Sequence, residues 1–283
     1  MFLLTSWITL SILSGLASNA FNFLSRYLLK DHEDPTAYAW FFEIVRIIVF
    51  GIIAIWDWRI VINVQSVIIF SLIGITEWVS VYWYMKMHES TYLSISAILT
   101  RTRLIWVPII AFFLIHESLK LPEYFGIVTL FIGLSIVVSP KNLVIDKGAR
   151  YANLSAFTIA LNIVLIKMAL PYGSNSIINA SNSLFPALLF PLVMKNRIPR
   201  IKKMFKNKLK IKLLAFLVNI ISAYLFTIAL RLGDSGKVTA IYQGMLVTSI
   251  IAGILFLKER NDIGKKILGT IITLIGVIVL SIY

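Results

Sequence analysis

The chain has 283 residues, of which 59% are hydrophobic and only 14% are charged. An ordinary soluble domain carries about 25% charged residues and needs a polar shell around its core. This composition, with a mean hydropathy of +0.87, excludes a soluble enzyme, a disordered protein and a nucleic-acid-binding domain, although the formal net charge is +14. The chain contains no cysteine, which excludes disulfides and thiolate metal sites.

Ten apolar stretches are long enough to cross a bilayer, which takes roughly 20 mainly apolar residues per helix. They are residues 2–29, 36–56, 66–86, 91–115, 122–139, 153–170, 175–194, 213–231, 237–257 and 263–282. The first stretch is too long for the core of a signal peptide, so we expect it to be retained as a helix. The sequence predicts an all-α polytopic protein with ten transmembrane helices, located in the plasma (inner) membrane.

The two halves of the chain resemble each other at a nearly constant offset. The matching pairs are Glu117 with Glu259, Ser80 with Ser222 and Arg101 with Gln243 at a shift of 142, Ser14 with Ser155 at a shift of 141, and Gly126 and Gly133 with Gly269 and Gly276 at a shift of 143. Five helices is an odd number, so the second half must enter the membrane from the opposite side. We therefore predict two inverted five-helix repeats, residues 1–140 and 141–283.

Two helices carry glycine pairs whose spacing has a packing consequence. Gly126 and Gly133 are seven residues apart, as are Gly269 and Gly276, so each pair lies on one helix face. Glycine lets helix backbones approach closely where lipid provides no hydrophobic drive for association. These faces are predicted to be sites of close helix packing.

Two stretches carry a resemblance to a known family. They are HESLKLPEYFGIVTLFIG at 116–133 and KERNDIGKKILGTIITLIG at 258–276. Both resemble the EamA-like ten-helix members of the drug/metabolite transporter superfamily, in which a Glu ends helices four and nine and a glycine-bearing helix follows. The resemblance implies two inverted five-helix bundles around a central cavity that opens to alternate sides. Known members export amino acids and other metabolites, and relatives carry nucleotide sugars and sugar phosphates.

Charged residues near the centres of the predicted spans are candidates for function. A charged side chain at this depth costs about 2.5–3.5 kcal/mol, so it must pair or face water in a cavity. Glu43 and Arg46 are three residues apart on one helix and can pair locally. Glu77 is free to meet an arginine of helix two or four. The alternative to a functional role is a buried ion-pair network that only orients the helices.

Two arginines in the fourth span depart from the usual family pattern. Arg101 and Arg103 point about 200° apart around a helix, so both cannot face one narrow cavity. We expect Arg101 to face the cavity, because its repeat partner Gln243 is also polar. Arg103 is expected to pair with an acid on a neighbouring helix.

The second half supplies amides rather than charges at the same depth, and two aromatic residues lie deep enough to stack on a solute. The candidate substrate-binding residues are Arg46, Glu77, Trp78, Arg101, Asn162, Asn219, Tyr242 and Gln243. The candidate ion-pair or coupling residues are Glu43, Arg46, Glu77 and Arg103. Arginines and amides together suit a carboxylate-bearing or zwitterionic solute.

The leading functional interpretation is a secondary transporter that exports a small polar metabolite, such as an amino acid. Two alternatives stay open: efflux of organic cations, with Glu77 as the anionic site, and a lipid-linked carrier flippase. The chain has no catalytic histidine–serine arrangement, phosphate-binding loop or metal-ligand motif, so we expect no enzyme activity, cofactor or metal. The expected partners are a small-molecule solute and membrane lipids, with no nucleic acid, and the chain is expected to be a monomer or homodimer.

The orientation in the membrane has two conflicting indications. The segment 195–212 is interpreted as a loop and carries nine of the 27 Lys and Arg residues with no acid. The positive-inside rule places this segment in the cytoplasm, and therefore both termini outside. The family resemblance instead implies cytoplasmic termini. The same basic segment is expected to contact anionic lipid headgroups.

Overall fold

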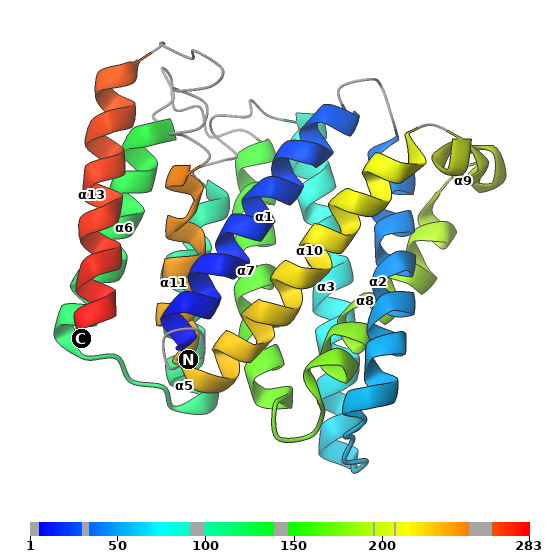
Figure 1. Ribbon diagram of the computed structural model, residues 1–283, viewed down its shortest axis with the longest axis horizontal. Coiled ribbons are helices and arrows are strands. Elements are labelled where there is room, and N and C mark those ends of the chain that lie inside the picture. The colour runs from blue at the N-terminus through cyan, green and yellow to red at the C-terminus, as the bar shows by residue number, and fades with distance from the viewer. Residues whose placement is uncertain are drawn as a thin grey trace.

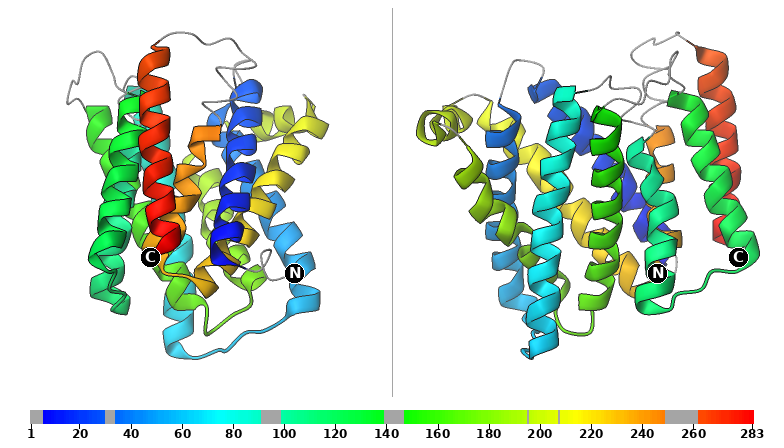
Figure 2. Two further views of the ribbon diagram at one scale, coloured as in Figure 1. Left: turned by 60° about the vertical axis from the view of Figure 1, so that its left-hand side comes forward. Right: turned by 180° about the vertical axis from the view of Figure 1, so that it is seen from behind.

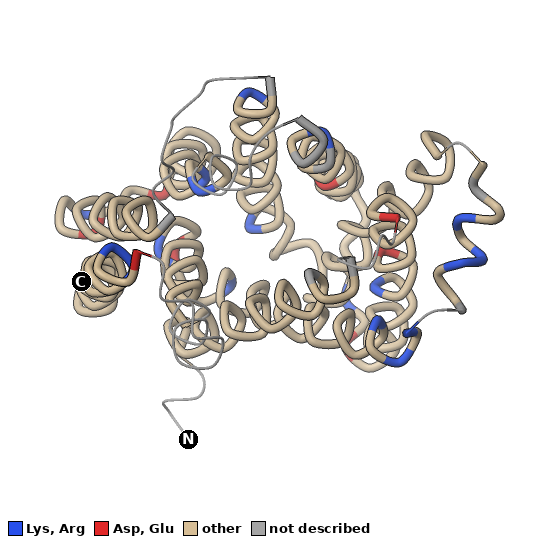
Figure 3. Tube along the Cα trace, turned by 90° about the horizontal axis from the view of Figure 1, so that it is seen from above, with Lys and Arg blue, Asp and Glu red and all other residues tan. Residues whose placement is uncertain are grey.

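A computed structural model of the chain describes residues 6–29, 34–90, 99–138, 147–194, 196–206, 208–248 and 262–283. Within these ranges the regular structure is helical, and one isolated backbone bridge joins Ile60 to Gly173. Apart from the short helix at residues 197–206, the long helices stand side by side along a common direction (Figure 1). Seen from above, they surround a common axis (Figure 3). The prediction of an all-α protein is confirmed.

The helices of the first half are α1 (Trp7–Leu29), α2 (Pro35–Asp57), α3 (Val64–Ser90), the short 3-10 helix η2 (Thr100–Thr102), α5 (Arg103–Ile115) and α6 (Leu121–Val138). Those of the second half are α7 (Lys147–Ala169), α8 (Asn175–Val193), α9 (Arg197–Lys206), α10 (Leu209–Leu232), α11 (Ser235–Gly244) and α13 (Ile263–Ile282). In the described part of the chain, seven helices have the length and composition to cross a membrane, namely α1, α2, α3, α7, α8, α10 and α13, and α6 is a shorter apolar helix. The predicted spans 91–115 and 237–257 lie partly outside the described residues, and η2, α5 and α11 occupy the parts that are described.

Helix starts follow from local sequence. Asp34 caps α2, because its carboxylate accepts hydrogen bonds from the backbone N–H groups of Thr36 and Ala37. Pro35 occupies the first helical position, where its missing N–H has no cost. Ser174 caps α8 through a hydrogen bond from the backbone N–H of Ile177.

The chain direction confirms that the two halves are inverted. The start of α1 and the end of α13 lie at one end of the molecule, which we call the termini side (Figure 1). Helix α1 runs away from the termini side, whereas its counterpart α7 runs toward it. The packing is symmetric as well: α3 packs on α7 as α10 packs on α1, and α5 packs on α7 as α11 packs on α1. The pairs α6–α13 and α2–α8 each join a helix to its own counterpart.

Four serines repeat the same symmetry at atomic scale. Ser14 donates through Oγ to the Ser222 carbonyl oxygen at 2.7 Å, which joins α1 to α10. Ser155 donates through Oγ to the Ser80 carbonyl oxygen at 3.2 Å, which joins α7 to α3. Ser155 is the repeat counterpart of Ser14, and Ser80 is the counterpart of Ser222, so the offset in the sequence corresponds to one contact made twice.

The glycine faces of α6 and α13 pack directly against each other (Figure 2). A Cβ atom built on Gly133 would lie 2.5 Å from the backbone nitrogen of Thr273, and one on Gly269 would lie 2.6 Å from the Gly133 carbonyl oxygen. A Cβ on Gly276 would lie 2.8 Å from the Gly126 carbonyl oxygen. The prediction of close packing at the glycine faces is confirmed, and the contact joins the last helices of the two repeats.

The interpretation of 195–212 as a loop is wrong. Residues 197–206 form α9, and α10 already begins at Leu209, so Lys210 and Lys212 are helical. Lys212 is fully buried and its Nζ donates to the Met204 carbonyl oxygen at 3.1 Å, near the end of α9. The segment is too short and too polar for a span, so a search for apolar stretches passes over it. A lysine that caps a neighbouring helix cannot be recognised from spacing alone.

An ion pair fixes α9 against the start of α2. Arg200 of α9 donates from Nε and Nη2 to the two carboxylate oxygens of Asp34. Burial acts to raise the pKa of Asp34, but the hydrogen bonds from Arg200 and from the backbone of Ala37 and Thr36 outweigh it and hold that pKa below its ordinary value. The same contact raises the pKa of Arg200. Asp34 therefore holds both α2 and α9 in place.

The α6–α13 contact predicts opposite effects for one substitution at two glycines. Gly133→Ala should lower the thermal unfolding temperature, by an amount corresponding to about 1–3 kcal/mol for overpacking. The matched control is Gly51→Ala in α2, where an added Cβ meets nothing within 4 Å. That variant should be neutral or slightly stabilising, since alanine is the better helix former. Equal effects at the two positions would contradict the close contact.

Candidate functional site

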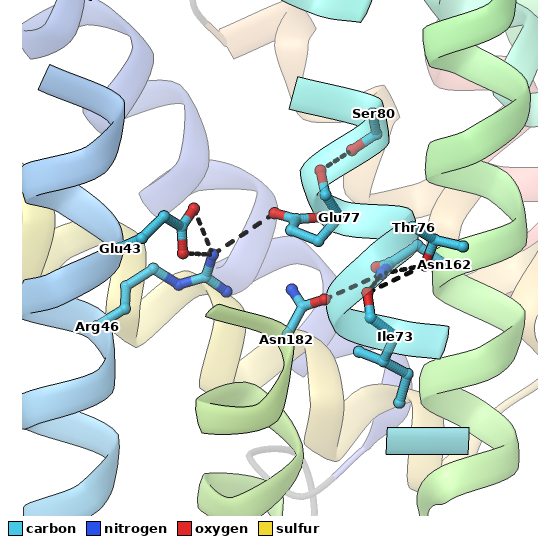
Figure 4. Close-up of polar contacts among 8 residues, drawn as sticks. All are labelled: Glu43, Arg46, Ile73, Thr76, Glu77, Ser80, Asn162 and Asn182. Carbon is cyan, nitrogen blue, oxygen red and sulfur yellow. Dashed lines mark hydrogen bonds and ion pairs between the residues drawn. The ribbon is translucent and has the colours of Figure 1, made fainter. Parts of the chain in front are cut away.

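A buried guanidinium between two carboxylates forms the centre of the candidate site (Figure 4). Arg46 Nη1 lies 3.1 Å from Glu43 Oε2 on the same helix and 3.6 Å from Glu77 Oε1 on α3. We call these three residues the charged triad. The side chains of Arg46 and Glu43 are 6% and 3% exposed, whereas that of Glu77 is 19% exposed. The expected pairing of Glu43 with Arg46 corresponds to these contacts, and of the two helices expected to offer Glu77 an arginine, helix two or helix four, it is helix two that does so.

An amide network continues the triad into the second repeat. Asn162 of α7 donates through Nδ2 to the Ile73 carbonyl oxygen at 2.8 Å and to Thr76 Oγ1 at 3.0 Å, both on α3. The same nitrogen lies 2.9 Å from Oδ1 of Asn182 on α8. Asn182 stands between Asn162 and the triad (Figure 4). The site is thus shared by α2 and α3 of the first repeat and α7 and α8 of the second.

Buried N–H groups near the triad lack partners within the described residues. They are Nε of Arg46 and Nε1 of Trp78, the residue next to Glu77. The Trp78 ring stacks on Tyr82 with centroids 6.1 Å apart. A buried donor without an acceptor is costly, so these two groups mark places where a polar ligand could bind.

A second polar group lies on other helices. Arg101, in η2, donates through Nη1 to the Leu134 carbonyl oxygen of α6 at 3.4 Å. Arg103 interacts electrostatically with Tyr84 and Tyr242. In the described part of the chain its buried Nε has no acceptor, and no ion pair to an acid is found, so the expected acidic partner of Arg103 is not observed. Gln243 of α11 also buries Nε2, for which the described residues offer no acceptor.

The remaining candidates are placed as follows. Tyr242 donates its hydroxyl to Ser18 Oγ at 2.7 Å and packs on Phe226 with centroids 4.9 Å apart. Asn219 is half-buried on α10, with no hydrogen bond from its side chain to the described residues. The candidates therefore form two sets, the charged triad with its asparagines and a group of arginines, Tyr242 and Gln243.

Ion pairs join the two repeats on the termini side, and none of the residues involved was among the predicted candidates. Glu117, at the end of α5, lies 3.2 Å from Lys167 Nζ of α7 and accepts from the Ser235 backbone N–H at 2.8 Å. Glu123 of α6 lies 2.7 Å from Lys237 Nζ of α11. We call these contacts the inter-repeat ion pairs.

Lys167 illustrates why these residues were missed. Its position near a span end is typical of a lysine that reaches the lipid interface. In the structure its Nζ instead donates to the carbonyl oxygens of Leu230 and Gly233, at 2.7 and 2.6 Å. One sequence signal could have pointed to this site: Glu117 recurs in the second repeat as Glu259, at the shift of 142 residues.

Comparisons with known proteins agree with this architecture. The model of the EamA-like transporter family matches residues 5–139 and 146–282. A solved crystal structure described only as that of a protein superimposes with a TM-score of 0.72 at 13% sequence identity, covering 96% of this chain and 98% of the other. That likeness concerns the fold alone. No curated protein matches.

The inverted helical repeats, the apolar spans and the double family match define an integral membrane transporter of the drug/metabolite transporter type. The chain belongs to the EamA-like transporter family. Members of this family are transporters rather than enzymes.

The triad geometry predicts a large stability effect for Arg46→Met. This change leaves two carboxylates in a buried site without their shared cation, which should destabilise the protein by about 3–5 kcal/mol. The triple variant E43Q/R46M/E77Q removes all three charges and should recover most of the loss. Arg150→Met, at an exposed arginine of α7, is the matched control. Thermal unfolding in detergent measures all three, and a small loss for Arg46→Met would contradict the triad.

Proposed function

We propose that the chain is a secondary active transporter that exports a small zwitterionic metabolite, such as an amino acid, by alternating access between its repeats. The observation that carries the proposal is that the bundle interior contains both a buried charged triad and buried N–H donors that have no acceptor among the described residues. An amino acid presents an ammonium and a carboxylate, and the two polar groups of the site offer complementary chemistry.

The ammonium end is assigned to the charged triad. Two carboxylates around one guanidinium leave the triad with one excess negative charge when both acids are ionised. Glu77 is the more accessible carboxylate and lies farther from Arg46 than Glu43 does. An ammonium group can therefore bind Glu77 without removing the Glu43–Arg46 pair. The same carboxylate is the proposed coupling group for a proton.

The carboxylate end is assigned to the N–H donors without acceptors. Arg103 Nε and Gln243 Nε2, in the second polar group, are buried donors that no described residue satisfies, and Trp78 Nε1, beside the triad, is a third. A carboxylate accepts several hydrogen bonds at once, and those from charged donors are the strongest. Recognition of a carboxylate distinguishes this proposal from the transport of a hydrophobic cation.

Efflux of an organic cation is the second candidate, because the excess negative charge of the triad supports it as well. A cation without a carboxylate would leave the Arg103 and Gln243 donors unsatisfied, which costs binding free energy. The two candidates therefore differ in whether Arg103 and Gln243 matter for transport.

The inter-repeat ion pairs support the alternating-access part of the proposal. Glu117 and Glu123 belong to the first repeat and Lys167 and Lys237 to the second, so both pairs hold the repeats together on the termini side. Ser235, whose backbone N–H donates to Glu117, is fully buried there. We assign the structure to the state in which the termini side is closed.

The proposal predicts that Glu77→Gln abolishes most amino-acid exchange in proteoliposomes while the protein stays folded. Hydrogen bonds to charged groups contribute about 1.5–3 kcal/mol, so exchange at low substrate concentration should fall about tenfold or more. Asp262→Asn, at an exposed acid before α13, is the control and should transport normally. Gln243→Ala should impair amino-acid exchange but not transport of tetraphenylphosphonium. Normal amino-acid exchange by Glu77→Gln would overturn the proposal.

The closed termini side gives a second prediction. The chain has no cysteine, so Ser235→Cys introduces a single reactive thiol at a buried position. Adding Glu117→Gln should weaken the contact with Lys167 and speed labelling by a water-soluble maleimide severalfold, because the open state becomes more populated. Asp262→Asn in the same background should leave the rate unchanged. An unchanged rate in the Glu117→Gln protein would argue against a gating role for this ion pair.

A further inference from the structure

Helix α9 lies outside the bundle and runs across the direction of the spans. It is seen nearly end-on in Figure 1 and along its length in Figure 3, at the end of the molecule opposite the termini side. A helix in this orientation at the end of a set of spans lies along the plane of the membrane surface. Its position calls for an explanation because its ten residues do not cross the bilayer.

One face of α9 is fixed to the protein. Met204 is fully buried, and the Phe205 ring packs on Phe41 of α2 with centroids 4.7 Å apart. Arg200 is bound to Asp34, and Lys212 caps the far end of the helix through the Met204 carbonyl oxygen. The helix is therefore held in a fixed position, and its remaining faces are presented at that position.

The exposed surface of α9, which includes the outer part of Phe205, carries apolar and basic side chains next to each other. Ile198 is 65% exposed and Phe205 is 49% exposed, although both are large apolar side chains. Lys202 and Lys203 are exposed, and the segment 195–212 contains no acid. At 100° per residue, Ile198 and Phe205 share one face of the helix, Lys202 lies at the edge of that face about 40° from Ile198, and Lys203 lies about 100° further round. This is the pattern of a helix that binds at a lipid interface.

We propose that α9 and its exposed lysines form a binding site for an anionic phospholipid of the membrane leaflet opposite the termini side. Lys202 and Lys203 bind the phosphate-bearing headgroup, while Ile198 and Phe205 contact the acyl chains. Charge complementarity selects an anionic lipid, and the apolar face selects a lipid over a soluble anion. The site is separate from the transport site, because Met204 and Arg200 face the protein and the lysines face outward.

The test is thermal stability of the purified full chain in a neutral detergent during titration with phosphatidylglycerol or phosphatidylcholine. Phosphatidylglycerol should stabilise the wild-type protein more than phosphatidylcholine does. Lys202→Gln and Lys203→Gln should each weaken the apparent affinity for phosphatidylglycerol about fivefold, and their effects should add in the double variant. Lys120→Gln, at an exposed lysine on the termini side, is the matched control and should bind like wild type.

Three results would overturn the proposal. The first is equal stabilisation by the two lipids. The second is an unchanged response in the double variant, or the same loss in the Lys120→Gln control. The third is stabilisation by soluble glycerol phosphate to the same extent as by phosphatidylglycerol, which would define an anion site without a lipid. Native mass spectrometry of retained phosphatidylglycerol provides a readout that does not depend on how a variant affects folding.

Discussion

The high cost of a charge in an apolar medium is the constraint on which the interior of this protein depends. Arg46 can be buried because it lies between Glu43 and Glu77, one on its own helix and one on α3. An ion pair in this setting gains little net stability, because desolvation offsets most of the attraction. An apolar interior of the same shape would hold the helices together equally well, and this is why we propose a functional role for the triad.

The same constraint operates at the termini side in another form. Lys167 is satisfied by Glu117 and by two carbonyl oxygens at the end of α10. Each of these groups belongs to a helix end, where backbone carbonyls lack partners within the helix. The inverted repeat brings helix ends from both halves to one level, so a contact that satisfies helix ends also links the repeats.

Most of the fold could be predicted from the sequence, because apolar stretches mark the membrane-spanning helices and a nearly constant offset between matching residues indicates that the two halves are repeats. The matching serines and the Gly126–Gly133 spacing had direct counterparts in the structure. Contacts between residues far apart in the sequence were harder to predict. Glu117 and Lys167 are 50 residues apart, and no sequence pattern around either residue identifies the other as its partner. Helix α9 was missed because its ten residues are too few and too polar for a span, although their amphipathic spacing can be read from the sequence.

The backbone contact between α6 and α13 also restricts how the repeats can move. Side chains at an ordinary helix interface can change rotamer and let two helices slide, but Gly133 and Gly269 have no side chain to adjust. If α6 and α13 slid along each other, larger residues of each helix would be forced into the space that the glycines leave. Rotation about the line of contact between α6 and α13 keeps the glycines of the two helices facing each other. In the alternating-access cycle that we propose, the α6–α13 contact would therefore be the axis about which one repeat turns against the other, with the largest displacements at the helices farthest from it.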